Sequence, residues 1–138
     1  MRSLLLAALA AASLWSCSSR ESQSAQFARF VDEYLYAWAG RHPSIAAGNG
    51  IHQHDRLLDD FSREAIEREI AQLKRDRDRL RAFRPEQLTP DERVDQRILD
   101  GVIDGWLLEQ ETVQNWRRNP MLYASALSDG VHNLMTQT

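Results

Sequence analysis

The feature that most constrains the fold is the helical spacing of apolar side chains, which recurs from residue 24 almost to residue 138. Apolar residues lie three and four positions apart in segment after segment, as they do on one face of an α-helix. Prolines separate these segments, and no alternating apolar and polar run of normal strand length is evident. The pattern predicts an all-α fold of long antiparallel helices.

The first two expected helices have clear signals for where they end or begin. One covers about residues 24–39, with Gly40 as its C-cap and Pro43 preventing continuation. Its aromatic-rich stripe favours a face turned to the core over a membrane-surface helix. The second helix begins with Ser62 as its N-cap and ends before Pro85. Residues 41–61 between them are expected to be irregular, apart from a short helical turn.

The third helix has the clearest start. Thr89 and Glu92 are spaced as a capping box, with Pro90 at the first helical position. We expect this helix to reach about Arg117, and the glycines at 101 and 105 to allow close packing of a neighbouring helix. It carries two apolar rows: Val94, Ile98, Val102 and Trp106, and Leu99, Ile103 and Leu107. A fourth helix begins at Asn119-Pro120.

Composition limits the class of protein. The chain is 43% apolar and 27% charged, which excludes the signature of a disordered protein. Its formal net charge of −3 gives no support to nucleic-acid binding. The second helix alternates acids and bases, so we expect a solvated face with pairs along the helix, such as Glu64–Arg68 and Lys74–Asp78.

The amino terminus predicts export. Arg2 precedes the apolar run Leu4–Ala12, which is too short to span a bilayer and has the length of a signal peptide core. Cys17 follows in the segment Leu14-Trp15-Ser16-Cys17, which resembles the lipobox of bacterial lipoproteins. The resemblance implies a lipid on the Cys17 sulfur and cleavage before it. The alternative is an ordinary exported protein in which Cys17 is incidental.

The chain is therefore expected to have three parts. Residues 1–16 form a lipoprotein signal peptide, residues 17–24 a polar tether, and residues 25–138 a helical segment. The lipid on Cys17 would anchor the chain to a membrane, which is the partner expected from the sequence. Ser18 after the cysteine suggests, by analogy with lipoprotein sorting, an outer-membrane anchor facing the periplasm.

No chemical site is predicted from the residues. His52, His54 and Asp55 form the one cluster of interest for a metal, but zinc would need a further ligand and a fixed second shell. A loop-shaping role is the simpler interpretation. The sequence contains no phosphate-binding glycine loop, G-x-S-x-G or H-E-x-x-H motif. We therefore assign neither catalytic residues nor metal ligands.

The order of these signals resembles the amino-terminal part of a bacterial family, domain of unknown function 885. The similarity begins near Phe27 and continues to residue 138. The segments that carry it are Pro43, Ala46-Ala47-Gly48, Gly50-Ile51-His52, Leu58-Asp59-Asp60-Phe61-Ser62, Leu88-Thr89, Asn119-Pro120-Met121-Leu122-Tyr123 and Leu127-Ser128-Asp129-Gly130-Val131.

The resemblance implies that the chain is the amino-terminal portion of a larger, mostly helical domain. Family members are zinc-peptidase-like and carry a later His-Glu-x-x-Pro-Gly-His segment, whose histidines would hold zinc and whose Glu would activate water. That segment is absent from these 138 residues. No cofactor is thus expected in this chain. The resemblance implies zinc and a peptide substrate only for a full-length form. The alternative is a small complete envelope lipoprotein that binds a partner without chemistry.

Overall fold

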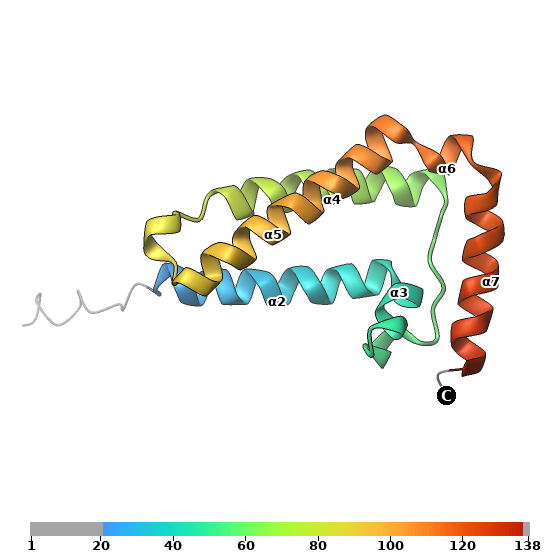
Figure 1. Cartoon of the computed structure of the whole chain (residues 1–138), viewed down its shortest axis with the longest axis horizontal. Coiled ribbons are helices and arrows are strands. Elements are labelled where there is room, and N and C mark those ends of the chain that lie inside the picture. The colour runs from blue at the N-terminus through green and yellow to red at the C-terminus, as the bar shows by residue number, and fades with distance from the viewer. Residues whose placement is uncertain (1–20, 137–138) are drawn as a thin grey trace, which may run out of the picture.

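The computed structural model describes residues 21–136, which form helices and helical turns and contain no strand (Figure 1). Three long helices make the main body: α2 (Gln23–Arg41), α4 (Arg63–Arg81) and α5 (Pro90–Leu107). They alternate in direction along the chain (Figure 1). The all-α prediction is confirmed.

Shorter elements gather at one end of this three-helix body. After α2 come α3 (Pro43–Gly48) and a 3₁₀ turn (His52–His54), and after α5 come α6 (Asn115–Arg118) and α7 (Pro120–Thr136). A second 3₁₀ turn, Pro85–Gln87, joins α4 to α5 at the other end. Helix α7 runs across the end of the body and returns towards α3 (Figure 1). None of the helices in residues 21–136 combines the length and apolar character needed to cross a bilayer.

The helix starts follow the sequence signals. The hydroxyl of Ser62 accepts a hydrogen bond from the Ala65 amide at 3.2 Å, so it caps α4 as predicted. At α5 both halves of the capping box form: Thr89 accepts from the Glu92 amide, and the Glu92 carboxylate accepts from the Thr89 amide. Helix α7 begins at Pro120, also as predicted.

Two helix ends differ from the expectation. Helix α2 continues through Gly40 and ends at Arg41, because His42, the residue before Pro43, leaves the helical backbone conformation with φ of −126° and ψ of 59°. The third helix does not reach Arg117. It changes at Leu108–Val113 into a π-helix, and Gln114 then adopts a left-handed backbone with φ of 55°.

The core lies between the three long helices. Phe83 at the end of α4 packs edge-on against Phe27, with ring centroids 5.4 Å apart, and also contacts Phe30. The buried cluster comprises Phe27, Phe30, Tyr34, Leu73, Leu80, Leu88, Ile103 and Leu107. The aromatic stripe of α2 therefore faces the core, as its spacing predicts.

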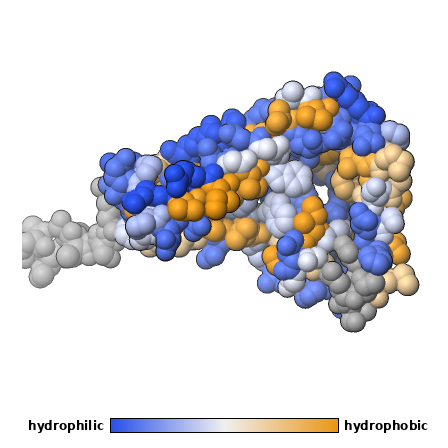
Figure 2. Space-filling model, viewed as in Figure 1, coloured by the Kyte–Doolittle hydropathy of each residue, from blue (hydrophilic) through white to orange (hydrophobic). Residues whose placement is uncertain are grey.

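Helix α5 packs one apolar row into this core, together with Trp106 from the other row. The row of Val94, Ile98 and Val102 faces outwards, and these side chains are 43%, 60% and 43% exposed. Figure 2 shows apolar surface along the outside of the body. The positions of Gly101 and Gly105 open into free space. The prediction that these glycines let a neighbouring helix pack closely is therefore wrong for the described residues.

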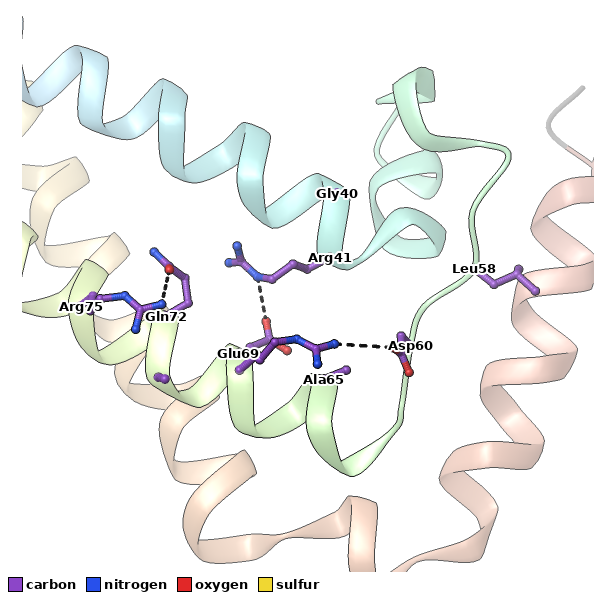
Figure 3. A pocket seen from close by; sticks show the side chains of 10 residues that line it. Gly40, Arg41, Leu58, Asp60, Ala65, Glu69, Gln72 and Arg75 are labelled. Carbon is purple, nitrogen blue, oxygen red and sulfur yellow. Dashed lines mark hydrogen bonds and ion pairs between the residues drawn. The ribbon is translucent and has the colours of Figure 1, made fainter.

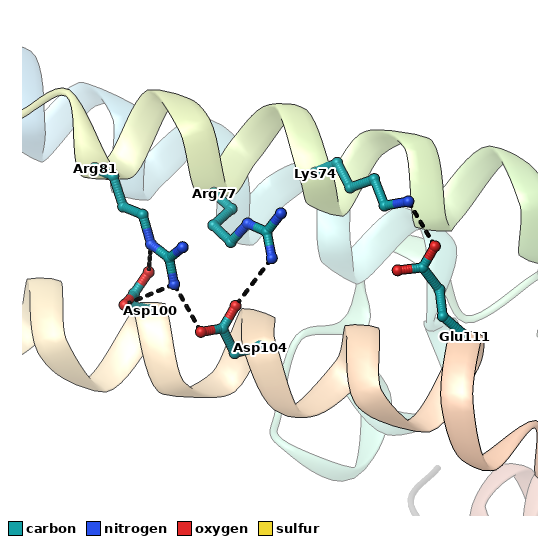
Figure 4. A network of polar contacts seen from close by, with 6 residues as sticks. All are labelled: Lys74, Arg77, Arg81, Asp100, Asp104 and Glu111. Carbon is teal, nitrogen blue, oxygen red and sulfur yellow. Dashed lines mark hydrogen bonds and ion pairs between the residues drawn. The ribbon is translucent and has the colours of Figure 1, made fainter.

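The charges of α4 also behave differently from the expectation. They pair across helices rather than along α4 (Figure 4). Arg81 contacts both Asp100 and Asp104 of α5, and its hydrogen bond to Asp100 is the main cause of a raised Arg81 pKa. Lys74 reaches Glu111 at 2.5 Å. The alternating charges thus hold α4 against its neighbour, although exposed pairs of this kind each contribute only about 0–1 kcal/mol.

Candidate functional site

The residues singled out from the sequence form a surface turn. His52 Nδ1 lies 3.1 Å from Asp55 Oδ2, and both side chains are exposed. The His54 ring packs instead on Tyr36, with centroids 5.8 Å apart, and lies beside Gly40. These contacts fit the loop-shaping interpretation. Cys17, the predicted lipidation site, lies outside the described residues.

No metal centre is formed within residues 21–136. No three His, Cys, Asp or Glu side chains there come together as a group that could hold an ion. The His-Glu-x-x-Pro-Gly-His segment to which the family resemblance assigns zinc does not occur in these 138 residues, so no residue here is assigned as a ligand of that site.

The structure brings together a different set of residues at the junction of α2, α3 and α4. His42 Nε2 lies 2.5 Å from Glu69 Oε1, and both side chains are buried. The two side chains share this hydrogen bond across the contact between α2 and α4. Arg41 Nε lies 3.5 Å from the same Glu69 oxygen (Figure 3). A carboxylate from α4 thus binds two consecutive residues at the end of α2.

Two tryptophans hold the imidazole in place. The His42 ring stacks on Trp106 of α5, with centroids 4.9 Å apart and planes inclined by 29°. Trp38, one helical turn before His42, contacts the same ring at 5.5 Å. His42 is therefore fixed by aromatic packing and by its bond to Glu69. Such restraint is what a binding or proton-handling group requires.

The polar set continues along the α2–α4 interface. Asp76 is buried one heptad after Glu69, and its Oδ1 accepts a hydrogen bond from Gln72 at 2.8 Å. Tyr34 faces this part of α4, and burial raises its pKa to about 12, with Asp76 and Glu69 adding to the rise and Arg41 opposing it. The Tyr34 hydroxyl and Arg41 Nη2 are buried without a hydrogen-bond partner among the described residues.

A cavity of about 570 Å³ opens beside this set, between the three-helix body and α7. The space-filling view is visibly hollowed there (Figure 2). Its lining includes His42, Glu69 and Trp106. The opposite wall comes from α6, α7 and the segment Asp59-Asp60-Phe61 before α4. The volume is that of a small-molecule site. The other lining residues are Arg41, Ser44, Ile45, Gly48, Asn49, Asp59, Asp60, Phe61, Ile66, Glu109, Gln110, Trp116, Leu122, Ser125, Ala126 and Asp129.

A second cleft, of about 540 Å³, is also lined by Glu69. Figure 3 shows Arg41 and Glu69 meeting between α2 and α4. Arg68 Nη2 lies 3.9 Å from Asp60 Oδ2. Arg75 donates to Gln72 at its far end. Glu69 thus contributes to the lining of both hollows.

Sequence reasoning missed Glu69 and Asp76, because their helix is charged all round and both were assigned to the solvated face. A signal was present in the spacing. Ile66, Leu73 and Leu80 mark the buried seam of α4, and positions 69 and 76 fall on the same heptad-like series. Acids on a seam of buried positions indicate partnered carboxylates.

Comparisons with protein-family models, with curated proteins and with solved structures find no match to this chain. The family resemblance therefore rests on the motifs of the sequence and their order alone.

Proposed function

We propose that this chain is an exported helical unit, anchored to the membrane by a lipid on Cys17, and that it forms the amino-terminal part of a larger zinc-peptidase-like protein. In this proposal it supplies a wall and a polar cavity rather than the catalytic metal. The catalytic segment of the resembled family, His-Glu-x-x-Pro-Gly-His, does not occur in these 138 residues. The chain alone is then expected to have no peptidase activity.

The observation that carries the proposal is the outer face of α5. Val94, Ile98 and Val102 form a continuous apolar row on the side of α5 opposite the core. A helix with apolar residues on two opposite faces is typical of one buried on both sides. Exposed apolar rows of this kind mark surfaces that another element covers, and further helices of a larger domain would cover it.

The gene itself gives the most direct test. We expect the reading frame to continue past codon 138 into helical sequence that contains a His-Glu segment. A stop codon at that position would contradict the proposal.

The exposed face gives a second test in the purified chain. Dyes that fluoresce on apolar surfaces should bind it, and Ile98→Gln should lower the signal, whereas Arg97→Gln beside it should not. A monodisperse protein that melts cooperatively and binds no dye would favour a complete small module. Zinc-dependent hydrolysis of peptides by the purified chain would also contradict the proposal.

The lipid anchor is tested separately by membrane fractionation. Cys17→Ala should release the chain from the membrane fraction, because the acceptor sulfur is lost. Ser18→Ala, at the next residue, should leave it there. Membrane association that survives Cys17→Ala would show that the anchor is assigned wrongly.

The 570 Å³ cavity favours the alternative function, a non-enzymatic binding module of the cell envelope. A cavity of this size with buried polar groups can bind a ligand without any reaction. The dye, melting and gene tests distinguish this module from part of a larger enzyme.

A further inference from the structure

The 540 Å³ cleft between the end of α2 and the first part of α4 carries an excess of positive charge. Its lining contains three arginines, Arg41, Arg68 and Arg75, and two acids, Asp60 and Glu69. From these side chains we infer that the cleft binds a ligand with one carboxylate group on a small aliphatic body. The inference uses only residues 21–136 and does not rest on the proposed peptidase relationship.

The first observation is the state of the Arg41 guanidinium. Its Nε and Nη2 atoms are buried and donate no hydrogen bond to a described residue. Nε approaches Glu69 Oε1 only to 3.5 Å, beyond the roughly 2.7–3.2 Å of an N–H···O hydrogen bond. Buried N–H groups without acceptors are costly. An oxygen of a ligand would supply an acceptor, because the Arg41 side chain lines the cleft and is 25% exposed.

The second observation is a contrast among the arginines of α4. Those in its later part each lie within 3.3 Å of a carboxylate oxygen of α2 or α5, and they are Arg77, Arg79 and Arg81. Arg75 forms no ion pair within residues 21–136 and donates to the neutral amide of Gln72 at 2.6 Å. Arg68 approaches Asp60 only to 3.9 Å. The arginines that lack a close carboxylate are thus the ones that line the cleft.

The charges of the lining indicate the charge of the ligand. Three guanidinium groups and two carboxylates leave a formal charge of +1. One carboxylate group balances that charge, and a guanidinium can bind both of its oxygens through parallel hydrogen bonds. A phosphate monoester, with a charge of about −1.5 to −2 at pH 7, would leave an excess of negative charge beside Asp60 and Glu69.

The rest of the lining limits the body of the ligand. Gly40, Ala65 and Ala71 have small side chains, and Leu58 adds an aliphatic surface. Figure 3 shows Arg41 and Glu69 in the middle of this group, with Arg75 and Asp60 to either side. No aromatic side chain belongs to the described lining. A compact aliphatic body fits such walls better than a stacked ring.

The neighbouring 570 Å³ cavity is less suited to an anion, although Arg41 lines it too. The other two arginines of the cleft do not belong to its described lining. Asp59, Glu109 and Asp129 line that cavity and not the cleft. An anion there would meet three further acids with one arginine to offset them, and it would be repelled. The carboxylate is therefore expected in the cleft.

The experiment compares two ligands with the same body. N-acetyl-leucine carries a carboxylate, and N-acetyl-leucinamide replaces it with a neutral amide. Both are titrated into the purified full chain in non-ionic detergent, and binding is followed by ligand-observed NMR. The buffer contains no carboxylate or phosphate and about 0.15 M chloride, which screens long-range attraction. We expect the acid to bind about tenfold more tightly than the amide, the effect of one favourable charge contact.

A third compound distinguishes two sources of the carboxylate, the end of a peptide and a free organic acid. Hexanoate has the charge and an aliphatic body but no peptide group. Weaker binding of hexanoate than of N-acetyl-leucine indicates the end of a peptide, and equal binding indicates a free acid. Both results support a carboxylate site.

Variants locate the site. Arg68→Gln and Arg75→Gln change exposed side chains of the cleft, and each should weaken binding of the acid about fivefold while leaving the amide unchanged. Arg41→Gln should weaken it further, because the buried donors are lost. Arg97→Gln removes the same charge from an exposed position on α5 outside the cleft, and it should leave both affinities unchanged. Circular dichroism of each variant shows that the helices are retained.

Four outcomes would overturn the inference. The acid and the amide could bind equally, neither could bind, or Arg97→Gln could weaken binding as much as the cleft variants. Tighter binding of inorganic phosphate than of N-acetyl-leucine would be the fourth, because the cleft would then select a more highly charged anion. None of these results bears on Cys17 or on the continuation of the gene, so failure here is separable from failure of the proposed function.

Discussion

The two ends of the three-helix body differ in how their polar groups are partnered. At the end where α5 begins, Ser24 donates to Glu92 at 2.5 Å, and Gln96 donates to the carbonyl oxygens of Leu80 and Phe83 at 3.0 Å each. That end is closed.

At the end covered by α7, Nη2 of Arg41 and one oxygen of Asp59 are buried without hydrogen-bond partners among the described residues. The 570 Å³ cavity lies at the same end, which we call the open end. The closed end therefore supplies stability, whereas the open end retains polar atoms that have no hydrogen-bond partner. Binding sites draw on such atoms.

The largest expected effect is a difference in the free energy of unfolding between substitutions at the two ends. Leu80 is fully buried near the closed end, whereas Leu127 on α7 is 69% exposed. Leu80→Ala should lower the free energy of unfolding by about 3 kcal/mol, because it removes apolar contacts and leaves a cavity. Leu127→Ala should change it by less than about 0.5 kcal/mol. Urea denaturation of both variants checks this, and equal losses would contradict the comparison.

The next effect concerns the polar junction at the open end. Glu69→Gln should lower the free energy of unfolding by about 2 kcal/mol, because His42 and Arg41 lose the charge that partners them inside the protein. Glu67→Gln, on the exposed side of the same helix, is the matched control and should cost almost nothing. A loss in both variants would show that helix charge, rather than the buried contact, is responsible.

A smaller effect of opposite sign is expected at Tyr34. Tyr34→Phe removes a buried hydroxyl that has no partner among residues 21–136, so the free energy of unfolding should rise by about 1 kcal/mol. A water-bridged hydroxyl would instead make the variant less stable.

The same residue predicts alkaline behaviour. Burial raises the Tyr34 pKa from 10.0 to about 12, so the folded state favours the neutral phenol. The stability that this contributes is fully present below pH 10 and is lost as the pH rises from 10 to 12. Tyr34→Phe should lose less stability than the parent chain over that range in urea titrations.

The smallest effect is at the closed end. A hydrogen bond from Ser24, together with one from the Thr89 amide, lowers the Glu92 pKa below its usual value. Because the Glu92 pKa is lower in the folded state than in the unfolded state, the charged carboxylate stabilises the fold at pH values above the unfolded-state pKa. This stability is lost as the pH falls through the folded-state pKa. Thermal melting at falling pH should therefore show a smaller decline for Glu92→Gln than for the parent chain. Asp91→Asn, in the same helical turn, should decline as the parent does.

Much of the fold could be predicted from local signals. Ser62, the Thr89 capping box and Pro120 mark helix starts through contacts within a few residues, and all three predictions are confirmed. Helix ends depend more on tertiary context. Gly40 is an ordinary helical residue here, and the apolar spacing after Leu107 predicts a continuous α-helix where the chain forms a π-helix.

The candidate site was much less predictable. His42 and Glu69 are 27 positions apart, and only the crossing of α2 and α4 brings them together. Local charge patterns gave no reason to choose Glu69 among the many acids of α4. Asp59, Glu109 and Asp129 line the cavity from separate segments, so their shared environment exists only in the folded chain.

The π-helix at Leu108–Val113 has a consequence for how the open end can vary. A π-helical turn holds about one residue more than an α-helical turn, and each residue in a helix rotates the next part of the chain by about 100°. Deleting one residue there would restore regular winding and swing α6 and α7 around the axis of α5. The width of the hollow is thus set by helical winding, and single-residue insertions or deletions could retune it in steps while the closed end stays intact.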